Sequence, residues 1–170
     1  LMLLGYMTDQ EVHDKQQADN SVFLEALVQT GRATLAKCGD TRLWIAVEKQ
    51  PLFKAIEQIG SVKTLANAEG MSDDQVKKLE ALAGRPATKE WTFTPEVKVP
   101  ANLASVEWTP EAALVELMRG RPEALGPVTG KQLAASIGMP VNKIEQALLA
   151  LEMEGFAFQG HYTPLAQAAD

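Results

Sequence analysis

The chain has 170 residues, of which 46% are hydrophobic, and this content is enough for a packed core in one mid-sized domain or two small ones. Its formal net charge of −6 has the wrong sign for a protein that binds nucleic acid mainly through phosphate contacts, so any such binding must be local. The single cysteine, Cys38, excludes an internal disulfide and a zinc site built from cysteines, and it favours a cytoplasmic location.

The start of the sequence carries no targeting or membrane signal. The apolar run from Leu1 to Leu4 is far shorter than the roughly 20 residues that a membrane-spanning helix needs, and no basic region accompanies it. We therefore expect no membrane partner. Because the first residue is leucine rather than methionine, we also expect the chain to be a piece of a longer protein.

Residues 1–60 are predicted to form helices followed by a β-hairpin, which is the outline of a winged-helix-like unit. Thr8 and Glu11 fit a capping box, in which two side chains satisfy backbone N–H groups at the start of a helix. A second helix is expected from near Val22 to Gln29 and ends at Gly31.

The hairpin consists of two predicted strands, Arg32 to Lys37 and Thr41 to Val47, joined by a turn at Gly39 and Asp40. Trp44 is expected on the face of the hairpin opposite to its buried side chains. The side chains expected to form the one buried face are Leu35, Leu43, Ile45 and Val47.

Residues 61–106 form a predicted connector with one helix and an extended segment. Ser72 and Gln75 fit a second capping box, and this helix is expected to run to about Ala83. The following segment is rich in prolines and is expected to be packed rather than disordered. The side chains expected to pack it are Trp91, Phe93 and Val97.

Residues 107–164 carry the clearest pattern, three helices with tight turns between them. Thr109 before Pro110 is typical of a helix start, and this first helix is expected to stop around Gly120 and Pro122. Thr129 and Gln132 fit a capping box for a short second helix, which is expected to end at Ile137.

The third helix follows the turn Gly138-Met139-Pro140 and is expected to end at Gly155, where a left-handed residue caps it. A strand is predicted from Phe156 to Tyr162. Three helices followed by a strand indicate a winged helix-turn-helix unit. The side chains predicted to form the buried stripe of the third helix are Ile144, Ala147, Leu148 and Leu151.

Together these patterns predict an α+β fold, mainly helical, with two winged-helix-like units. The units span residues 1–60 and 107–164, the connector spans residues 61–106, and residues 165–170 form a tail. No catalytic constellation is visible, since His13, His161 and Cys38 lie in different predicted elements. No phosphate-binding glycine loop and no metal-ligand spacing are present, so we expect neither a cofactor nor a metal in this chain.

The remaining candidate chemistry is contact with nucleic acid. Trp44 could stack on an unpaired base, although a tryptophan in a hairpin also packs on neighbouring elements. Arg119 and Arg121 are alternatively explained as complements to the end of the first helix. The residues expected to touch nucleic acid are Arg119, Arg121, Lys131, Lys143, Arg32, Arg42 and Trp44.

The outer face of the third helix is half polar and half apolar, with Lys143 at its flank. A helix that reads base edges presents donors, so this face favours docking on another domain over reading a duplex. The residues expected to form this docking face are Asn142, Gln146, Leu149 and Met153.

Three stretches carry a resemblance to a known family: ALVELMRGRPEALGPVTGKQLAASIGM (113–139), ALLALEMEGFAFQGHYTP (147–164) and, more loosely, LVQTGRATLAKCGDTRLWIAVEK (27–49). Together they resemble the region after the motor domains in the large helicase-related (Lhr) family of DEAD/DEAH-type ATP-dependent DNA helicases. The chain departs from that family at Pro122, where leucine is usual. It also departs at residues 159–162, where the family commonly has an arginine-rich ending.

The resemblance implies a non-catalytic accessory module that grips single-stranded DNA behind the motor domains in DNA repair. Its implied partners are single-stranded DNA, bound weakly and without sequence preference, and the RecA-like motor domains and winged helix of the parent chain. ATP and Mg are implied for the parent helicase only. A different hypothesis is a winged-helix module that binds protein alone, and a freestanding glycosylase is a third, whose glutamine-based motif is not recognisable here.

Overall fold

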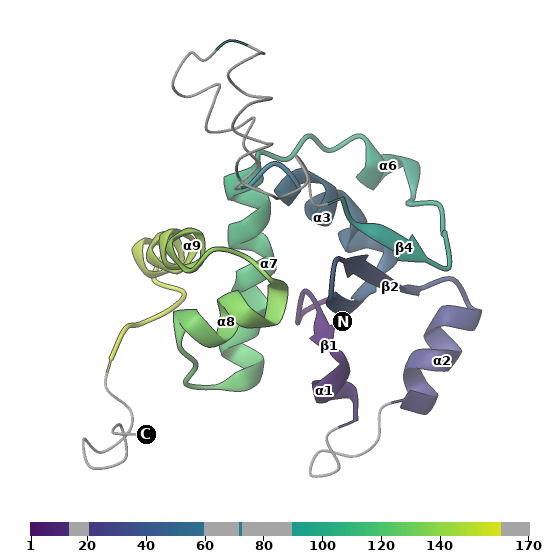
Figure 1. Cartoon of the computed structure of the whole chain (residues 1–170), viewed down its shortest axis with the longest axis horizontal. Coiled ribbons are helices and arrows are strands. Elements are labelled where there is room, and N and C mark those ends of the chain that lie inside the picture. Colours follow the sequence, from purple (N-terminus) through teal and green to yellow (C-terminus); the bar gives the residue numbers. More distant parts are fainter. Residues whose placement is uncertain (14–20, 60–71, 73–89, 161–170) are drawn as a thin grey trace.

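The computed structural model describes residues 1–13, 21–59, 72 and 90–160, which form an α+β fold in which helices pack around a four-stranded antiparallel sheet (Figure 1). The predicted fold class is confirmed at this level. The strand order is β1-β3-β2-β4, with bounds Met7–Thr8 (β1), Ala33–Cys38 (β2), Thr41–Ala46 (β3) and Thr92–Thr94 (β4).

The helices are spread along the whole described chain. In the first half they are α1 (Asp9–Val12), α2 (Ser21–Gln29), the 3₁₀ helix η1 (Val47–Lys49) and α3 (Gln50–Ile56). In the second half they are α6 (Ala101–Ala104), α7 (Pro110–Leu125), α8 (Gly130–Ile137) and α9 (Val141–Met153). The helix predicted from Ser72 to Ala83 falls almost wholly outside the described residues.

The predicted hairpin is confirmed, with Gly39 in the left-handed conformation that its turn requires. One detail of the prediction is wrong. Leu35 lies directly opposite Trp44, so these two side chains share a face and Leu35 does not join Leu43 and Ile45. The turn pairs odd-numbered residues of β2 with even-numbered residues of β3, so Ala36 lies opposite Leu43 instead.

The end of the expected connector belongs to the sheet. β4 pairs with β2, which places Phe93 opposite Ala36 at the edge of the buried face. Trp91 is buried, and its ring meets that of Phe53 edge-on at a centroid distance of 4.9 Å. Because an edge-on aromatic pair adds to the burial of its surface, Trp91 anchors this stretch to the core, as its apolar character indicated.

The three predicted helices of the second half are present, and the capping residues act as expected. The Thr129 side chain accepts from the backbone N–H of Gln132, and the Thr109 side chain accepts from that of Ala112. The first of these helices is longer than predicted, because α7 continues past Gly120 and Pro122 to Leu125. Pro122 lies in the last turn, so few backbone bonds are lost, and its carbonyl accepts the closing bond from Gly126.

The predicted strand from Phe156 to Tyr162 is wrong over residues 156–160, which are neither strand nor helix. The chain leaves α9 through Gly155, which is left-handed, and the backbone N–H of Phe156 returns to the carbonyl of Leu151. A strand needs a neighbour to bond its backbone, and no described strand pairs with these residues. Residues 161 and 162 lie outside the described part, which therefore shows three helices without a wing.

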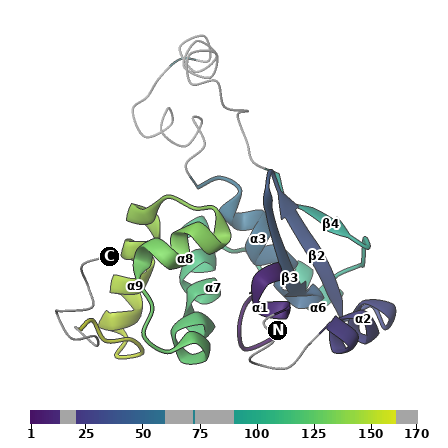
Figure 2. The same ribbon diagram turned by 60° about the horizontal axis from the view of Figure 1, so that its bottom comes forward.

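A continuous hydrophobic core joins the sheet to the three helices. Leu43 and Phe53 of the first half and Leu117, Ile144 and Leu151 of the second belong to the same buried cluster. α3 packs on α7, and α8 touches both α9 and β3. Figure 2 shows α7, α8 and α9 gathered on one side of the sheet, with α3 between.

Candidate interaction surface

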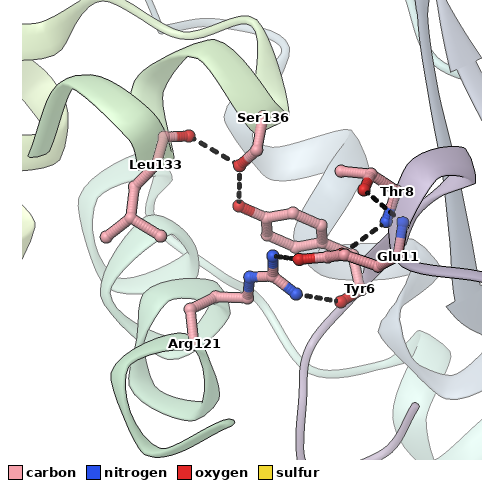
Figure 3. A network of polar contacts seen from close by, with 6 residues as sticks. All are labelled: Tyr6, Thr8, Glu11, Arg121, Leu133 and Ser136. Carbon is pink, nitrogen blue, oxygen red and sulfur yellow. Dashed lines mark hydrogen bonds and ion pairs between the residues drawn. The ribbon is translucent and has the colours of Figure 1, made fainter. Parts of the chain in front are cut away.

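The guanidinium of Arg121 lies inside the protein, where it ties α7 to the N-terminal segment (Figure 3). Its side chain is only 2% exposed. Nη1 donates a hydrogen bond of 2.7 Å to the carbonyl oxygen of Tyr6, and Nη2 forms an ion pair with Glu11. The guanidinium also lies over the Tyr6 ring, at 4.3 Å from its centroid.

Glu11 serves two partners with its two carboxylate oxygens. Oε2 accepts from the backbone N–H of Thr8 at 2.7 Å and so closes the predicted capping box at the start of α1. Oε1 faces Arg121. The glutamate that closes the capping box of α1 therefore also fixes α1 to the end of α7.

Tyr6 completes the contact between the N-terminal segment and α8. Its hydroxyl lies 2.7 Å from Oγ of Ser136, whose own proton goes to the carbonyl of Leu133 at 2.8 Å. Tyr6 is therefore the donor in this pair. Burial raises the pKa of the Tyr6 hydroxyl above its usual value, since the charged phenolate would lose its hydration there, and the nearby charge of Arg121 offsets only part of that loss.

This network corrects the interpretation of Arg121. The sequence suggested a surface cation at the end of a helix, available for phosphate, but the structure gives this guanidinium a carboxylate and a backbone carbonyl as partners. Because the guanidinium is buried and already paired through Nη1 and Nη2, with only its Nε left without a hydrogen-bond partner, Arg121 is not a surface contact for DNA in this fold.

Arg119 is also committed to partners within the chain. Nη1 forms a 2.7 Å ion pair with Glu154, Nε bonds Glu116 at 3.2 Å, and the guanidinium lies 5.1 Å from the centroid of Phe156. The hydrogen bond that Arg119 donates to Glu154 raises the pKa of Arg119, which stays charged. Arg119 therefore fixes the exit from α9 onto α7, and little of its charge is left for a ligand.

Glu116 connects this cluster to the first half of the chain. Its Oε1 accepts from Nζ of Lys49 at 3.0 Å, so it binds one cation on each side. Partial burial raises the pKa of Glu116, but the hydrogen bonds and charges of Lys49 and Arg119 outweigh burial and hold the pKa below its usual value. Glu116 is thus ionised and pairs with both cations.

Lys131, Lys143 and Arg32 remain as cations without such partners. Lys131, in the first turn of α8, and Arg32, just before β2, are exposed, and Lys143 in the first turn of α9 is half-buried. Within the described ranges none of the three forms an ion pair. Of the cations predicted to touch nucleic acid, these three are the ones whose charge is left for a phosphate.

Trp44 and Arg42 share a single carboxylate. Nε1 of Trp44 donates to Oδ1 of Asp9 at 2.9 Å, and Nε of Arg42 lies 3.2 Å from Oδ2 of the same residue. Trp44 is half-buried and faces away from Leu43 and Ile45, as predicted. Asp9 therefore orients both candidates but also adds negative charge beside them.

An open groove of about 780 Å³ runs between α1, the hairpin turn and α8. Three carboxylates, of Asp9, Glu11 and Asp40, line it against two guanidiniums, of Arg42 and Arg121, which pair with Asp9 and Glu11, and apolar side chains from the loop before α8 close its far wall. Its charges are mixed and mostly negative. The groove is therefore a poor site for a phosphate.

The outer face of α9 is exposed along its length. Asn142 and Gln146 are exposed, and the apolar pair Leu149 and Met153 is 57% and 83% exposed. The opposite stripe of the helix lies in the core, as the periodicity predicted. The four outer residues, Asn142, Gln146, Leu149 and Met153, are called the outer stripe below.

Two glutamates beside the outer stripe were not among the residues predicted from the sequence. At about 100° per residue, Glu145 and Glu152 fall on one flank of the stripe and Lys143 falls on the other. Both glutamates are exposed, and neither has an ion-pair partner within the described ranges. The same helical periodicity that placed Leu149 and Met153 would have located them.

No protein-family model matches this chain, and no curated protein matches its sequence. None of the described helices is both long enough and apolar enough to cross a membrane. The function must therefore be inferred from the geometry of this surface. Its features are two arginines that pair with glutamates of the same chain, a few exposed cations, and an outer stripe with an acidic flank.

Proposed function

We propose that this chain is a non-catalytic accessory module of an Lhr-like ATP-dependent DNA helicase. It docks on a neighbouring domain through the outer stripe of α9 and touches single-stranded DNA with cations that lie elsewhere. The observation that carries this proposal is that the two faces of α9 have different environments. One of its faces fills the core, while the other exposes Leu149 and Met153.

The resemblance in sequence supports the choice of parent protein. Two of the stretches that carry it, residues 113–139 and 147–164, cover most of α7, all of α8 and the second half of α9 with the described part of its exit. Leu149 and Met153 lie inside the second of these stretches. A module that works beside motor domains needs a packed core and a surface for contact, and this chain has a common core and the exposed outer stripe.

The burial of Arg121 and the pairing of Arg119 change where DNA contact is expected. Lys131, Lys143 and Arg32 replace them as the first candidates, with Trp44 and Arg42 as a second group near Asp9. Few phosphates can be neutralised by so few cations. Binding to single-stranded DNA should therefore be weak, independent of sequence and sensitive to salt.

A second candidate function is a module that binds protein only. Arg119 and Arg121 favour a protein partner over DNA, because both form ion pairs within the chain. Their partners are Glu11, Glu116 and Glu154. Residues 110–160 carry six glutamates against four lysines and arginines. This unit as a whole is thus acidic, which suits a protein partner better than a nucleic acid.

The test is fluorescence anisotropy of a labelled oligothymidylate titrated with the chain. Neutralising about two phosphates predicts that the affinity falls roughly tenfold when the salt rises from about 50 to about 200 mM. A duplex of random sequence serves as the comparison and should bind no more tightly. If the oligothymidylate does not bind at the lower salt, DNA contact is refuted and the protein-only candidate stands.

A further inference from the structure

The outer stripe of α9 has the spacing of a helix-pairing surface. Asn142, Gln146, Leu149 and Met153 follow one another at intervals of four, three and four residues. This is the alternation with which two helices pack along a common seam. Since the other face of α9 is already fixed in the core, the outer stripe is presented on a rigid support.

The flanks of the stripe determine which helix can pair with it. Glu145 and Glu152 are seven residues apart, so both project on the same side of the seam, one helical repeat from each other. Both are exposed and without an ion-pair partner within the described ranges. A partner that presents lysine or arginine along this side would form an ion pair with each of them.

The same flank argues against a second copy of this chain. In an antiparallel pair of α9 helices, Glu145 and Glu152 would face the same glutamates of the other copy and repel them. In a parallel pair Glu145 would face Ala150 and gain nothing. The net charge of −6 adds a general repulsion between copies.

We infer that the outer stripe of α9 binds an amphipathic helix of another domain, one with an apolar seam and a basic flank. This inference rests on the docking part of the proposed function and states the chemistry of the partner. The surface is small, with only two large apolar side chains. Affinity in the micromolar range is therefore expected, as for interfaces below about 1,200 Å².

The experiment uses two fluorescent helical peptides as probes. Both have leucines at alternating intervals of three and four residues, and they differ in carrying either lysine or glutamate along the flanks. The intact chain should bind the lysine peptide at least tenfold more tightly than the glutamate peptide. The double variant Glu145→Lys, Glu152→Lys should bind the lysine peptide more weakly than the unmodified chain does, and it should bind the glutamate peptide more tightly.

A matched control distinguishes the effect of Glu145 and Glu152 from the effect of the chain's overall negative charge on a basic peptide. The double variant Glu25→Lys, Glu96→Lys makes the same change of charge at exposed positions far from α9, and its affinity should change less than twofold. The variant Leu149→Ser, Met153→Ser should bind the lysine peptide about tenfold more weakly. Both residues are exposed, so this variant keeps its fold.

Three outcomes would overturn the inference. They are an equal loss in the control variant, unchanged binding after removal of Leu149 and Met153, and dimerisation of the chain that these two substitutions abolish. Loss of the peptide preference with oligothymidylate binding intact would refute the inference and leave the proposed function standing. Peptide preference without oligothymidylate binding would support the inference and refute the DNA contact.

Discussion

Nη1 of Arg121 donates a 2.7 Å hydrogen bond to the carbonyl oxygen of Tyr6, which lies 115 residues earlier in the chain. Together with the ion pair to Glu11, this bond connects the N-terminal segment to the last turn of α7. It explains why an arginine with the sequence context of a surface residue is buried. It also makes stability, rather than DNA affinity, the property that a change at Arg121 should affect.

Arg121→Met should destabilise the protein strongly. Methionine fills much of the volume but removes the donor from the carbonyl of Tyr6 and from Oε1 of Glu11, which should cost about 3 kcal/mol in the free energy of unfolding. Urea unfolding followed by circular dichroism measures this loss. Arg32→Met, at an exposed position, is the control and should change stability by less than about 0.5 kcal/mol. Equal effects of the two changes would show that the Arg121 network contributes nothing.

Gly120→Ala should displace the N-terminal segment from α7. A Cβ at this position would lie 1.7 Å from the carbonyl oxygen of Leu3, and that atom belongs to the backbone and cannot rotate away. We expect a loss of about 2 kcal/mol, in the range of overpacked sites, measured by urea unfolding.

The control for Gly120 is Gly130→Ala in the first turn of α8. The nearest atom to a Cβ there is a side-chain carbon of Glu145 at 3.5 Å, an ordinary contact. This change should be neutral or should stabilise the protein by up to about 1 kcal/mol. A stable Gly120→Ala protein would mean that the close approach of Leu3 to α7 does not exist in solution.

Tyr6 should make stability fall at high pH. Its pKa is raised in the folded state, chiefly by burial, so the unfolded chain loses this proton first as the pH passes 10. The contribution of Tyr6 is therefore complete below pH 10 and is lost as the pH rises through the folded pKa.

The comparison with Tyr6→Phe isolates this effect. Phenylalanine keeps the ring between Arg121 and the core but lacks the hydroxyl that reaches Ser136. Below pH 10 the unmodified chain should be more stable by about 1 kcal/mol, the usual value of such a bond. The difference between the two unfolding free energies should shrink above pH 10. If the difference in unfolding free energy between the two proteins stays constant up to about pH 11.5, the conclusion that the Tyr6 hydroxyl is buried and neutral in the folded state is wrong.

Local chemistry predicted the local structure well. The capping boxes at Thr8 and Thr129, the turn at Gly39 and the buried stripe of α9 all depend on residues within a few positions of one another. What failed depends on distant partners. Nothing near Arg121 in the sequence indicates Tyr6 and Glu11, and the pairing of Leu35 with Trp44 depends on the register of the hairpin.

The candidate site shows the same division. Helical periodicity alone indicated that Leu149 and Met153 face outward, and both are exposed. The cations were assigned by charge, and charge does not reveal whether a carboxylate such as Glu154 stands beside Arg119. Residues 156–160 look like a strand in composition, but a strand forms only where another strand bonds to it.

The most direct test of the proposed function compares Lys131→Glu with Arg119→Gln in binding to labelled oligothymidylate by fluorescence anisotropy at low salt. Lys131 is exposed and has no ion pair within the described ranges, so its reversal should weaken binding several-fold. Arg119 is held by Glu116 and Glu154, so its neutralisation should change the affinity less than twofold. Absence of binding by the unmodified chain, or an equal loss in both variants, would contradict the account.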